Sequence, residues 1–170
     1  PRRGHRFVMD ALPGLVHSST DWFINDAGII ITETTIGDYE GFDTRGVPEF
    51  ARARLAAQFS GSIDDVDRLL RQDSNGAYAN TWLIGDIKTS EIAKLELGLK
   101  NTVLHRSSQG AFFGANYPED GKLIAEECPD FKYDAADGTE VRRARWAAVI
   151  AEHKGKIDAE IAKAMLADTV

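Results

Sequence analysis

The stretch that decides the fold is residues 75–86, NGAYANTWLIGD, in which a turn leads directly into an apolar strand. The Asn75-Gly76 dipeptide is typical of tight turns. The β-forming residues after it predict a buried strand over residues 80–86. Asn80 stands at the mouth of that strand, so a carboxamide is placed where the chain is about to enter a core.

Further strands are predicted on both sides of this stretch. After it, short links separate the strand-like runs 91–98, 101–107 and 111–116, which predicts an antiparallel meander. Before it, the sequence alternates and is dense in β-formers, which predicts strands over residues 5–10, 14–18, 21–25 and 28–36.

Two pairs of helices complete the pattern. They are predicted over residues 48–59, 63–71, 139–153 and 156–168. The resulting order is strands, two helices, strands, two helices. It predicts a single α+β domain over residues 1–170 in which helices pack on stacked antiparallel sheets, although the pattern leaves a single-sheet α+β fold open.

The helix over 48–59 has an unusual distribution of apolar residues. They do not form one stripe, which predicts burial on more than one side. Arg52 and Arg54 fall beside phenylalanines and are therefore expected to be partnered. Ser62, with Asp65 three residues later, approximates a capping box at the start of the second helix.

Composition excludes several classes of function. The net charge of −7 and the pI near 5.1 argue against a nucleic-acid partner, because phosphate binding requires a basic surface. No run approaches the ~20 apolar residues that span a bilayer. The single cysteine excludes an internal disulfide and a Cys-based zinc site, and the four histidines lack metal-ligand spacing. We expect no metal and no cofactor.

Two tempting nucleophiles are set aside. Cys128 lies between carboxylates that would raise the pKa of its thiol, and no histidine is close in sequence. Ser18, with His17 and Asp21, has the residue types of a hydrolase triad. Real triads are assembled from distant segments, so chance composition explains this grouping better.

Carboxylates and asparagines at strand ends are the remaining candidates. Asp21, Glu33 and Asp86 are either catalytic acids or partners of salt bridges to Arg52 or Arg54 that fix the helix on the sheet. Turn formation accounts for Asn25 and Asn75. It accounts less well for Asn80 and Asn116, whose neutral carboxamides at strand ends could donate to a developing oxyanion.

Four ordered motifs resemble those of phospholipase B-like proteins. They are PGLVHSSTDWF at 13–23, GIIITETTI at 28–36, RARLA at 52–56 and SNGAYANTW at 74–82. A later element, GANYP at 114–118, is similar to one in penicillin-acyltransferase-like and ceramidase-like enzymes. Each motif alone is weak, and their shared order makes the resemblance specific over residues 4 to about 90.

The resemblance implies an N-terminal-nucleophile hydrolase, matured by self-cleavage, with two stacked antiparallel sheets between helical layers. Such enzymes use an amino-terminal cysteine, with its own α-amine as the base, to cleave amides or transfer acyl groups. By this resemblance Asn80 would be an oxyanion-hole donor, supported by Asp21, Arg52 and Arg54. We further assign substrate binding to Asn116, Trp82 and Asn25.

The sequence departs from that pattern at the nucleophile. Residue 1 is proline and no cysteine precedes Cys128, so we expect the nucleophile in a missing upstream segment of the same protein. The partners expected are that segment and a small or lipid-like amide or acyl substrate, while self-association and the compartment (secreted, periplasmic or lysosome-like) stay open. Two rival hypotheses are a non-catalytic binding domain with the same fold and a plain α+β domain whose motif matches are coincidental.

Overall fold

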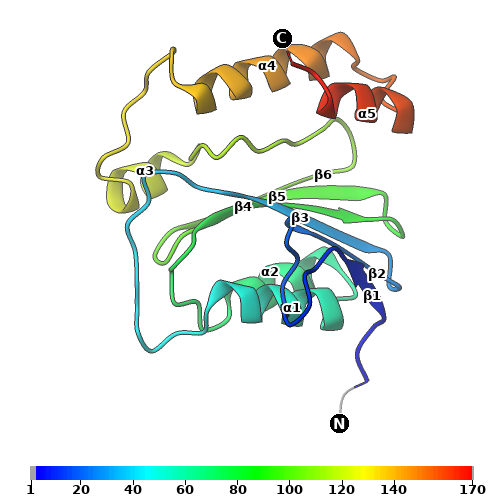
Figure 1. The fold of residues 1–170 in the computed structure, drawn as a ribbon, viewed down its shortest axis with the longest axis vertical. Helices are drawn as coiled ribbons and strands as arrows, with labels where there is room; N and C mark the ends of the chain where they lie inside the picture. Colours follow the sequence, from blue (N-terminus) through cyan, green and yellow to red (C-terminus); the bar gives the residue numbers. More distant parts are fainter. Residues whose placement is uncertain (1–2, 170) are drawn as a thin grey trace.

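The structure, a computed structural model, describes residues 3–169. These residues form one antiparallel sheet of six strands, in which every strand pairs with its neighbours in the sequence (Figure 1). The strands are β1 (Phe7–Met9), β2 (Trp22–Asn25), β3 (Ile29–Thr35), β4 (Asn80–Asp86), β5 (Glu91–Leu97) and β6 (Thr102–Ser107).

Helices lie on both sides of this sheet. Figure 1 shows α1 and α2 on one side and α4 and α5 on the other. Their bounds are α1 (Glu49–Phe59), α2 (Ile63–Arg71), α3 (Gly121–Glu127), α4 (Gly138–Glu152) and α5 (Ala159–Leu166). The α+β class is confirmed. The described residues contain one sheet, so the second sheet expected from the resemblance is not among them.

The main hydrophobic core lies between the sheet and the α1–α2 pair. Trp82 at its centre is fully buried, and Ile31 and Ile84 face each other across β3 and β4. Alternation along each strand puts Phe23, Ile29 and Leu95 on this face as well, while Ile30 and Leu83 lie on the other face. The buried core residues are Phe23, Ile29, Ile31, Ala53, Ala56, Ala57, Ile63, Val66, Leu69, Leu70, Trp82, Ile84, Ala93, Leu95 and Leu97.

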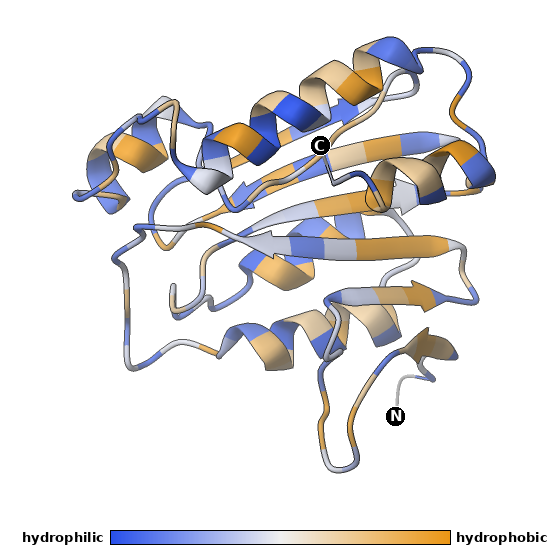
Figure 2. Ribbon diagram, turned by 45° about the horizontal axis from the view of Figure 1, so that its top comes forward, coloured by the Kyte–Doolittle hydropathy of each residue, from blue (hydrophilic) through white to orange (hydrophobic). Residues whose placement is uncertain are grey.

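β3 is apolar at its start and polar at its end, whereas β4 is polar at its start, apolar in its middle and ends at Asp86 (Figure 2). β3 begins with three isoleucines and ends in threonines and Glu33, while β4 begins with Asn80 and Thr81. Since the two strands are antiparallel and Thr35 lies opposite Asn80, their polar ends coincide. One end of the sheet thus gathers hydrogen-bonding groups beside the core.

Helix α1 corrects one expectation. Its buried residues are Glu49, Arg52, Ala53, Ala56 and Ala57, which form a single face, while Phe50 and Leu55 are exposed. The helix is therefore buried on one side rather than several. Small alanines on the inner face let it approach the sheet closely.

Two predicted strands are absent from the described chain. Residues 14–18 turn instead, because Gly14 has a positive φ of 89° and the Ser18 hydroxyl accepts the N–H groups of Thr20 and Trp22. Residues 111–116 are irregular: Phe113 stacks on Trp146 of α4, with ring centroids 6.4 Å apart, instead of extending the sheet.

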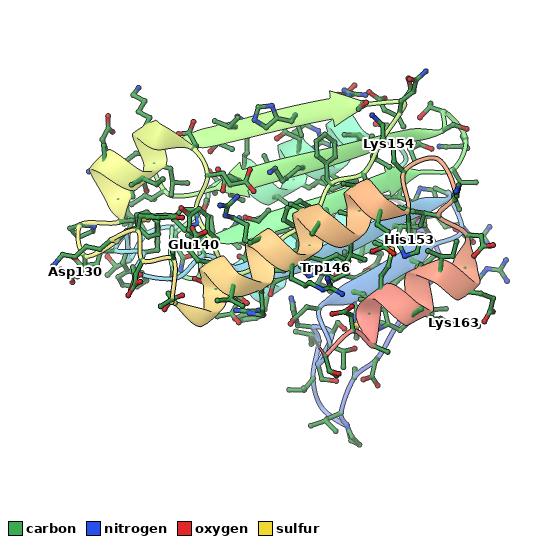
Figure 3. The ribbon with its side chains drawn as sticks, turned by 90° about the horizontal axis from the view of Figure 1, so that it is seen from above. Asp130, Glu140, Trp146, His153, Lys154 and Lys163 are labelled. Atoms are coloured by element: carbon green, nitrogen blue, oxygen red, sulfur yellow. The ribbon has the colours of Figure 1, made fainter. Side chains whose placement is uncertain are left out.

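The other face of the sheet is covered by the irregular segment 108–118 and by α4 and α5. Figure 3 shows α4 lying across the sheet, with Trp146 along it and α5 beside it. The short helix α3 was not predicted. It begins where Asp120 accepts the N–H groups of Lys122 and Leu123, and its seven residues are too few for a clear apolar period.

Candidate functional site

The polar ends of β3 and β4 hold a buried pair of side chains, Glu33 and Asn80. Asn80 Nδ2 donates a hydrogen bond to Glu33 Oε2 over 2.6 Å, and Asn80 is 1% exposed. Glu33 lies opposite Trp82 in the register, which places the pair on the face that α1 covers. The sheet therefore presents a carboxyl group to the helical layer at the edge of the core.

The pKa of Glu33 is raised to about 7, chiefly by burial. The hydrogen bond from Asn80 acts in the opposite sense, and the negative charges of Asp21 and Glu49 raise the pKa further. A carboxyl group with this pKa changes its protonation state near neutral pH. It therefore has the property required of a general acid or base.

His17 connects this region to the first turn of α1. Its Nε2 lies 3.2 Å from Glu49 Oε1, and its Nδ1 lies 2.7 Å from the carbonyl oxygen of Ser18, to which it donates. The hydrogen bond to Glu49 raises the pKa of His17, against the effect of burial. The ring packs edge-on against Phe23, with centroids 5.3 Å apart, so its orientation is fixed.

A cleft of about 680 Å³ opens beside these groups. It forms where the loop before β2, the start of α1 and the segment before β4 meet. Its lining residues are Gly14, Leu15, Val16, His17, Ser18, Asp21, Pro48, Glu49, Phe50, Asn75, Ala77 and Tyr78. Four titratable residues, His17, Asp21, Glu49 and Tyr78, therefore line one cavity.

Asp21 is the predicted residue that the fold places in this cleft. It has a positive φ of 58°, and its carbonyl oxygen accepts the N–H of Glu33 over 3.1 Å. The backbone of Asp21 is thereby tied to the strand that carries Glu33. The prediction that Asp21 supports a site near Asn80 remains a prediction, now with a geometric basis.

The two arginines lie outside the lining of the cleft and bind backbone carbonyls. Arg52 donates from Nε to Val47 O over 3.0 Å and from its guanidinium to Leu70 O. Arg54 donates to Val16 O over 3.2 Å, and its guanidinium carbon lies 4.6 Å from the centroid of the Phe7 ring. Neither arginine forms an ion pair with a carboxylate among residues 3–169, so the salt bridges considered from the sequence are not formed there.

The third carboxylate singled out from the sequence, Asp86, has a local role. It is buried at the end of β4, and its Oδ1 accepts the N–H of Lys88 in the turn to β5 over 2.9 Å. Asp86 thus shapes the β4–β5 turn, at the other end of the strand from Asn80.

The three residues assigned to substrate binding are not brought together. Asn25 donates to the carbonyls of Ala57 and Ser60, which ties β2 to the end of α1. Trp82 is sealed in the core, and its Nε1 has no partner among the described residues. Asn116, with a φ of 59°, donates to Thr35 O over 2.8 Å at the same end of the sheet as Asn80.

Cys128 has the environment of an unreactive thiol. It is 2% exposed, and burial, followed by the charge of Glu127, raises its pKa to about 11. Ser18 likewise has a structural role, because its hydroxyl accepts two backbone N–H groups in the loop before β2. Neither side chain is arranged as a nucleophile.

Glu49 and Asn75 are residues of the cleft that the sequence did not single out. Glu49 looked like an ordinary acidic residue in the first turn of a helix. Asn75 looked like a turn residue, yet it is 6% exposed and lines the cleft. Their grouping with His17 and Asp21 around the cleft depends on contacts between segments far apart in the sequence, and no local motif records these contacts.

The fold and the cleft define an α+β protein with a carboxyl-rich site at the polar end of one antiparallel sheet. Comparison with known families is more specific. The profile of the phospholipase B family matches residues 1–147, and the chain therefore belongs to the phospholipase B family. The hypothesis that the motif matches are coincidental is wrong.

Curated relatives match a shorter part of the chain. The putative phospholipase B-like 2 of Homo sapiens is 29% identical over 91 residues, and that of Bos taurus is 28% identical over 91 residues. Each alignment covers 50% of this chain and 15% of the relative. The chain therefore spans 15% of the length of these relatives.

A solved structure shows a slight similarity. A variant of conjugated bile acid hydrolase from Clostridium perfringens aligns with a TM-score of 0.39 and 13% identity, over 51% of this chain and 30% of that one. At this TM-score the similarity does not define a shared fold. Within residues 3–169, no helix is both long enough and apolar enough to cross a bilayer.

Proposed function

We propose that this chain is part of an amide or acyl hydrolase of the N-terminal-nucleophile type, acting on a small or lipid-like substrate. The observation that carries the proposal is the match of the phospholipase B family to residues 1–147. The site adds chemical support. Glu33 has a pKa raised to about 7 and feels the charges of His17, Asp21 and Glu49, which line the cleft, while Glu33 itself is buried behind that lining. Groups of this kind can exchange protons with a substrate near neutral pH.

The proposal assigns the nucleophile to a cysteine outside residues 1–170. The thiol of Cys128 is buried and its pKa is raised, so it supplies little thiolate at neutral pH. The second sheet of the expected sandwich is assigned to the same additional part of the enzyme. Both would be joined to this chain in the mature protein.

Asn80 is proposed as the oxyanion donor. An amide nitrogen carries two hydrogens, and the bond to Glu33 uses one of them. That bond fixes the orientation of the carboxamide, which is the preorganisation that an oxyanion hole requires. Asp21, Arg52 and Arg54 would act by positioning the backbone around the site. The carbonyl of Asp21 accepts the N–H of Glu33. The side chains of Arg52 and Arg54 donate to the carbonyls of Val47 and Val16.

Intact-mass analysis of the full-length protein tests the proposed class. A fragment that begins with cysteine would support self-cleavage and a cysteine nucleophile. A single uncleaved chain that hydrolyses no N-acyl substrate would contradict the proposal. That result would favour the alternative of a non-catalytic ligand-binding domain, for which the nearly complete burial of Asn80 is the supporting observation.

Asn80→Ala in the full-length enzyme tests the proposed role of that residue. Removal of one oxyanion donor typically lowers turnover by about 10²–10³. Asn25→Ala is the matched control, because among the described residues the Asn25 side chain binds only backbone groups at the end of α1, in the β2–β3 turn and at the start of β3. We expect Asn25→Ala to lower the midpoint of unfolding while the folded fraction keeps its turnover. An unchanged rate in folded Asn80→Ala would remove Asn80 from the site.

A further inference from the structure

The cleft beside α1 carries an excess of carboxylates. Among residues 3–169, its ionisable lining residues are His17, Asp21, Glu49 and Tyr78, and none of the lining residues is a lysine or an arginine. His17 and Glu49 lie 3.2 Å apart and offset each other when the ring is protonated. Asp21 is then left without a cation in the lining. Arg52 and Arg54, which extend from α1, are both bonded to backbone carbonyls.

A second, independent feature of the cleft is an unsatisfied hydrogen-bond acceptor. Asn75 lines the cleft and is 6% exposed, and its Oδ1 is buried with no partner among the described residues. The backbone around it is fully engaged, since Asn75 N donates to Val47 O and Asn75 O accepts from Asp43 N. A buried acceptor without a donor costs free energy, so this position suits a ligand that brings an N–H or O–H group.

The rim of the cleft is apolar. Leu15, Val16, Phe50 and Tyr78 are each about half exposed, between 48% and 54%. They come from three different segments and surround the polar lining on one side. Contiguous exposed apolar side chains beside a polar pocket are typical of ligand-binding grooves. A matching ligand has a charged or donating head and an apolar body.

We propose that this cleft binds a primary ammonium group carried on an apolar chain. The ammonium supplies a positive charge for Asp21 and donates a hydrogen bond to Asn75 Oδ1, while the apolar chain lies against Leu15, Val16 and Phe50. A primary ammonium has three N–H donors, which suits this combination better than a quaternary ammonium, which has none.

The link of this site to catalysis rests on the proposed function. Hydrolysis of an N-acyl amine adds water across the C–N bond, leaving a carboxylic acid and an amine. At neutral pH the acid loses a proton and the released amine gains one, so the amine product is an ammonium ion. The cleft would then hold this product. Binding itself does not depend on turnover.

Titration calorimetry of the purified protein with hexylammonium at pH 7 tests the proposal, with hexanol and hexanoate as neutral and anionic counterparts. We expect hexylammonium to bind at least tenfold more tightly than either counterpart. Its affinity should fall as the salt concentration rises. Vesicles of phosphatidylcholine that contain or lack phosphatidylethanolamine separate the two sources of such a group, a free amine and a lipid headgroup. Equal binding of all three hexyl compounds, or no response to any of these probes, would overturn the proposal.

Two variants locate the binding in the cleft. Asp21→Asn removes the charge and suits the positive φ at this position, because asparagine tolerates that conformation. Asn75→Ala removes the acceptor and keeps the backbone bonds. Each should weaken hexylammonium binding about tenfold or more, whereas the exposed Asp130→Asn should leave it unchanged. If both variants bind as tightly as the parent, the ammonium binds elsewhere, and this proposal fails whether or not the full-length protein is a hydrolase.

Discussion

At the scale of single residues, the pair of Glu33 and Asn80 shows how a raised carboxyl pKa and a cost in stability come from the same burial. Glu33 sits on the core face of β3, where desolvation disfavours its charged form. The hydrogen bond from Asn80 compensates only in part. The folded protein therefore holds a proton on Glu33 more tightly than the unfolded chain does.

The raised pKa of Glu33 predicts a dependence of stability on pH. Between pH 4.5 and about 7 the folded state binds more protons at this site than the unfolded state, so the free energy of unfolding falls as the pH rises. The full effect is on the order of 3 kcal/mol above pH 7. Glu33→Gln keeps an acceptor for Asn80 and cannot ionise, so it should be more stable than the parent at pH 8 and similar to it at pH 4.5.

Denaturant unfolding at a series of pH values measures this difference. Glu152→Gln is the matched control, because Glu152 is exposed and the same change there should alter stability little at any pH. The interpretation of Glu33 would be wrong if Glu33→Gln shifted stability equally at pH 4.5 and pH 8.

At the scale of elements, Arg52 joins the two helices that cover the core. It binds the carbonyl of Val47, just before α1, and that of Leu70, in the last turn of α2. The Leu70 carbonyl lies in the last turn of α2 and lacks a helical partner, so the arginine supplies its donor, whereas the Val47 carbonyl also accepts the N–H of Asn75. Arg52 is 2% exposed, so its role is structural, although the helix that carries it begins at the cleft.

Arg52→Met should lower the free energy of unfolding, because it removes the hydrogen bonds that link α1 to α2. It keeps the apolar part of the side chain and leaves both carbonyls without their charged donor, which should cost about 2–4 kcal/mol. Arg54→Met is the natural comparison: it removes one bond to Val16 and a cation–π contact to Phe7, worth about 0.5–1 kcal/mol. If thermal unfolding shows the same loss of stability for Arg52→Met and Arg54→Met, the bridge between α1 and α2 contributes nothing of its own.

Elements with local signals were predictable from the sequence. β4 occupies residues 80–86 and α2 occupies 63–71, as predicted. α2 could be placed because Ser62 accepts the N–H of Asp65 at the helix start, while the Asp65 side chain accepts from Gly61. The segment 111–116 could not be placed, because its outcome depends on Phe113 packing against Trp146, 33 positions later in the chain.

The candidate site was predictable only in part, for the same reason. Asp21 and Asn80 stood out because strand ends rarely need such groups. The cleft itself is made by three segments that meet through tertiary contacts, so the local patterns of Glu49 and Asn75 indicated only a helix start and a turn. The positions of single polar residues were visible in the sequence, and their grouping around a cavity was not.

At the scale of the whole molecule, the two sides of the sheet are packed very differently. The α1–α2 side contains the continuous core around Trp82. On the other side, α4 buries only Glu140 and Val149 and α5 buries only Met165 among their described residues. The phospholipase B match also ends at residue 147, within α4. The site lies on the well-packed side, where a fixed geometry can be maintained.

This asymmetry predicts two levels of protection in native-state hydrogen exchange. Amides of β3, β4 and β5 should exchange only through global unfolding, because opening any of these strands exposes the main core. Amides of α4 and α5 should exchange through local opening, at a lower free energy that changes little with denaturant. α2 is the internal control: it is a helix too, but it buries Ile63, Val66, Leu69 and Leu70, so its amides should behave like those of the strands. Equal protection of α4 and β4 would show that both layers unfold as one unit, and would mean that the few buried side chains of α4 hold it as firmly as the core holds the sheet.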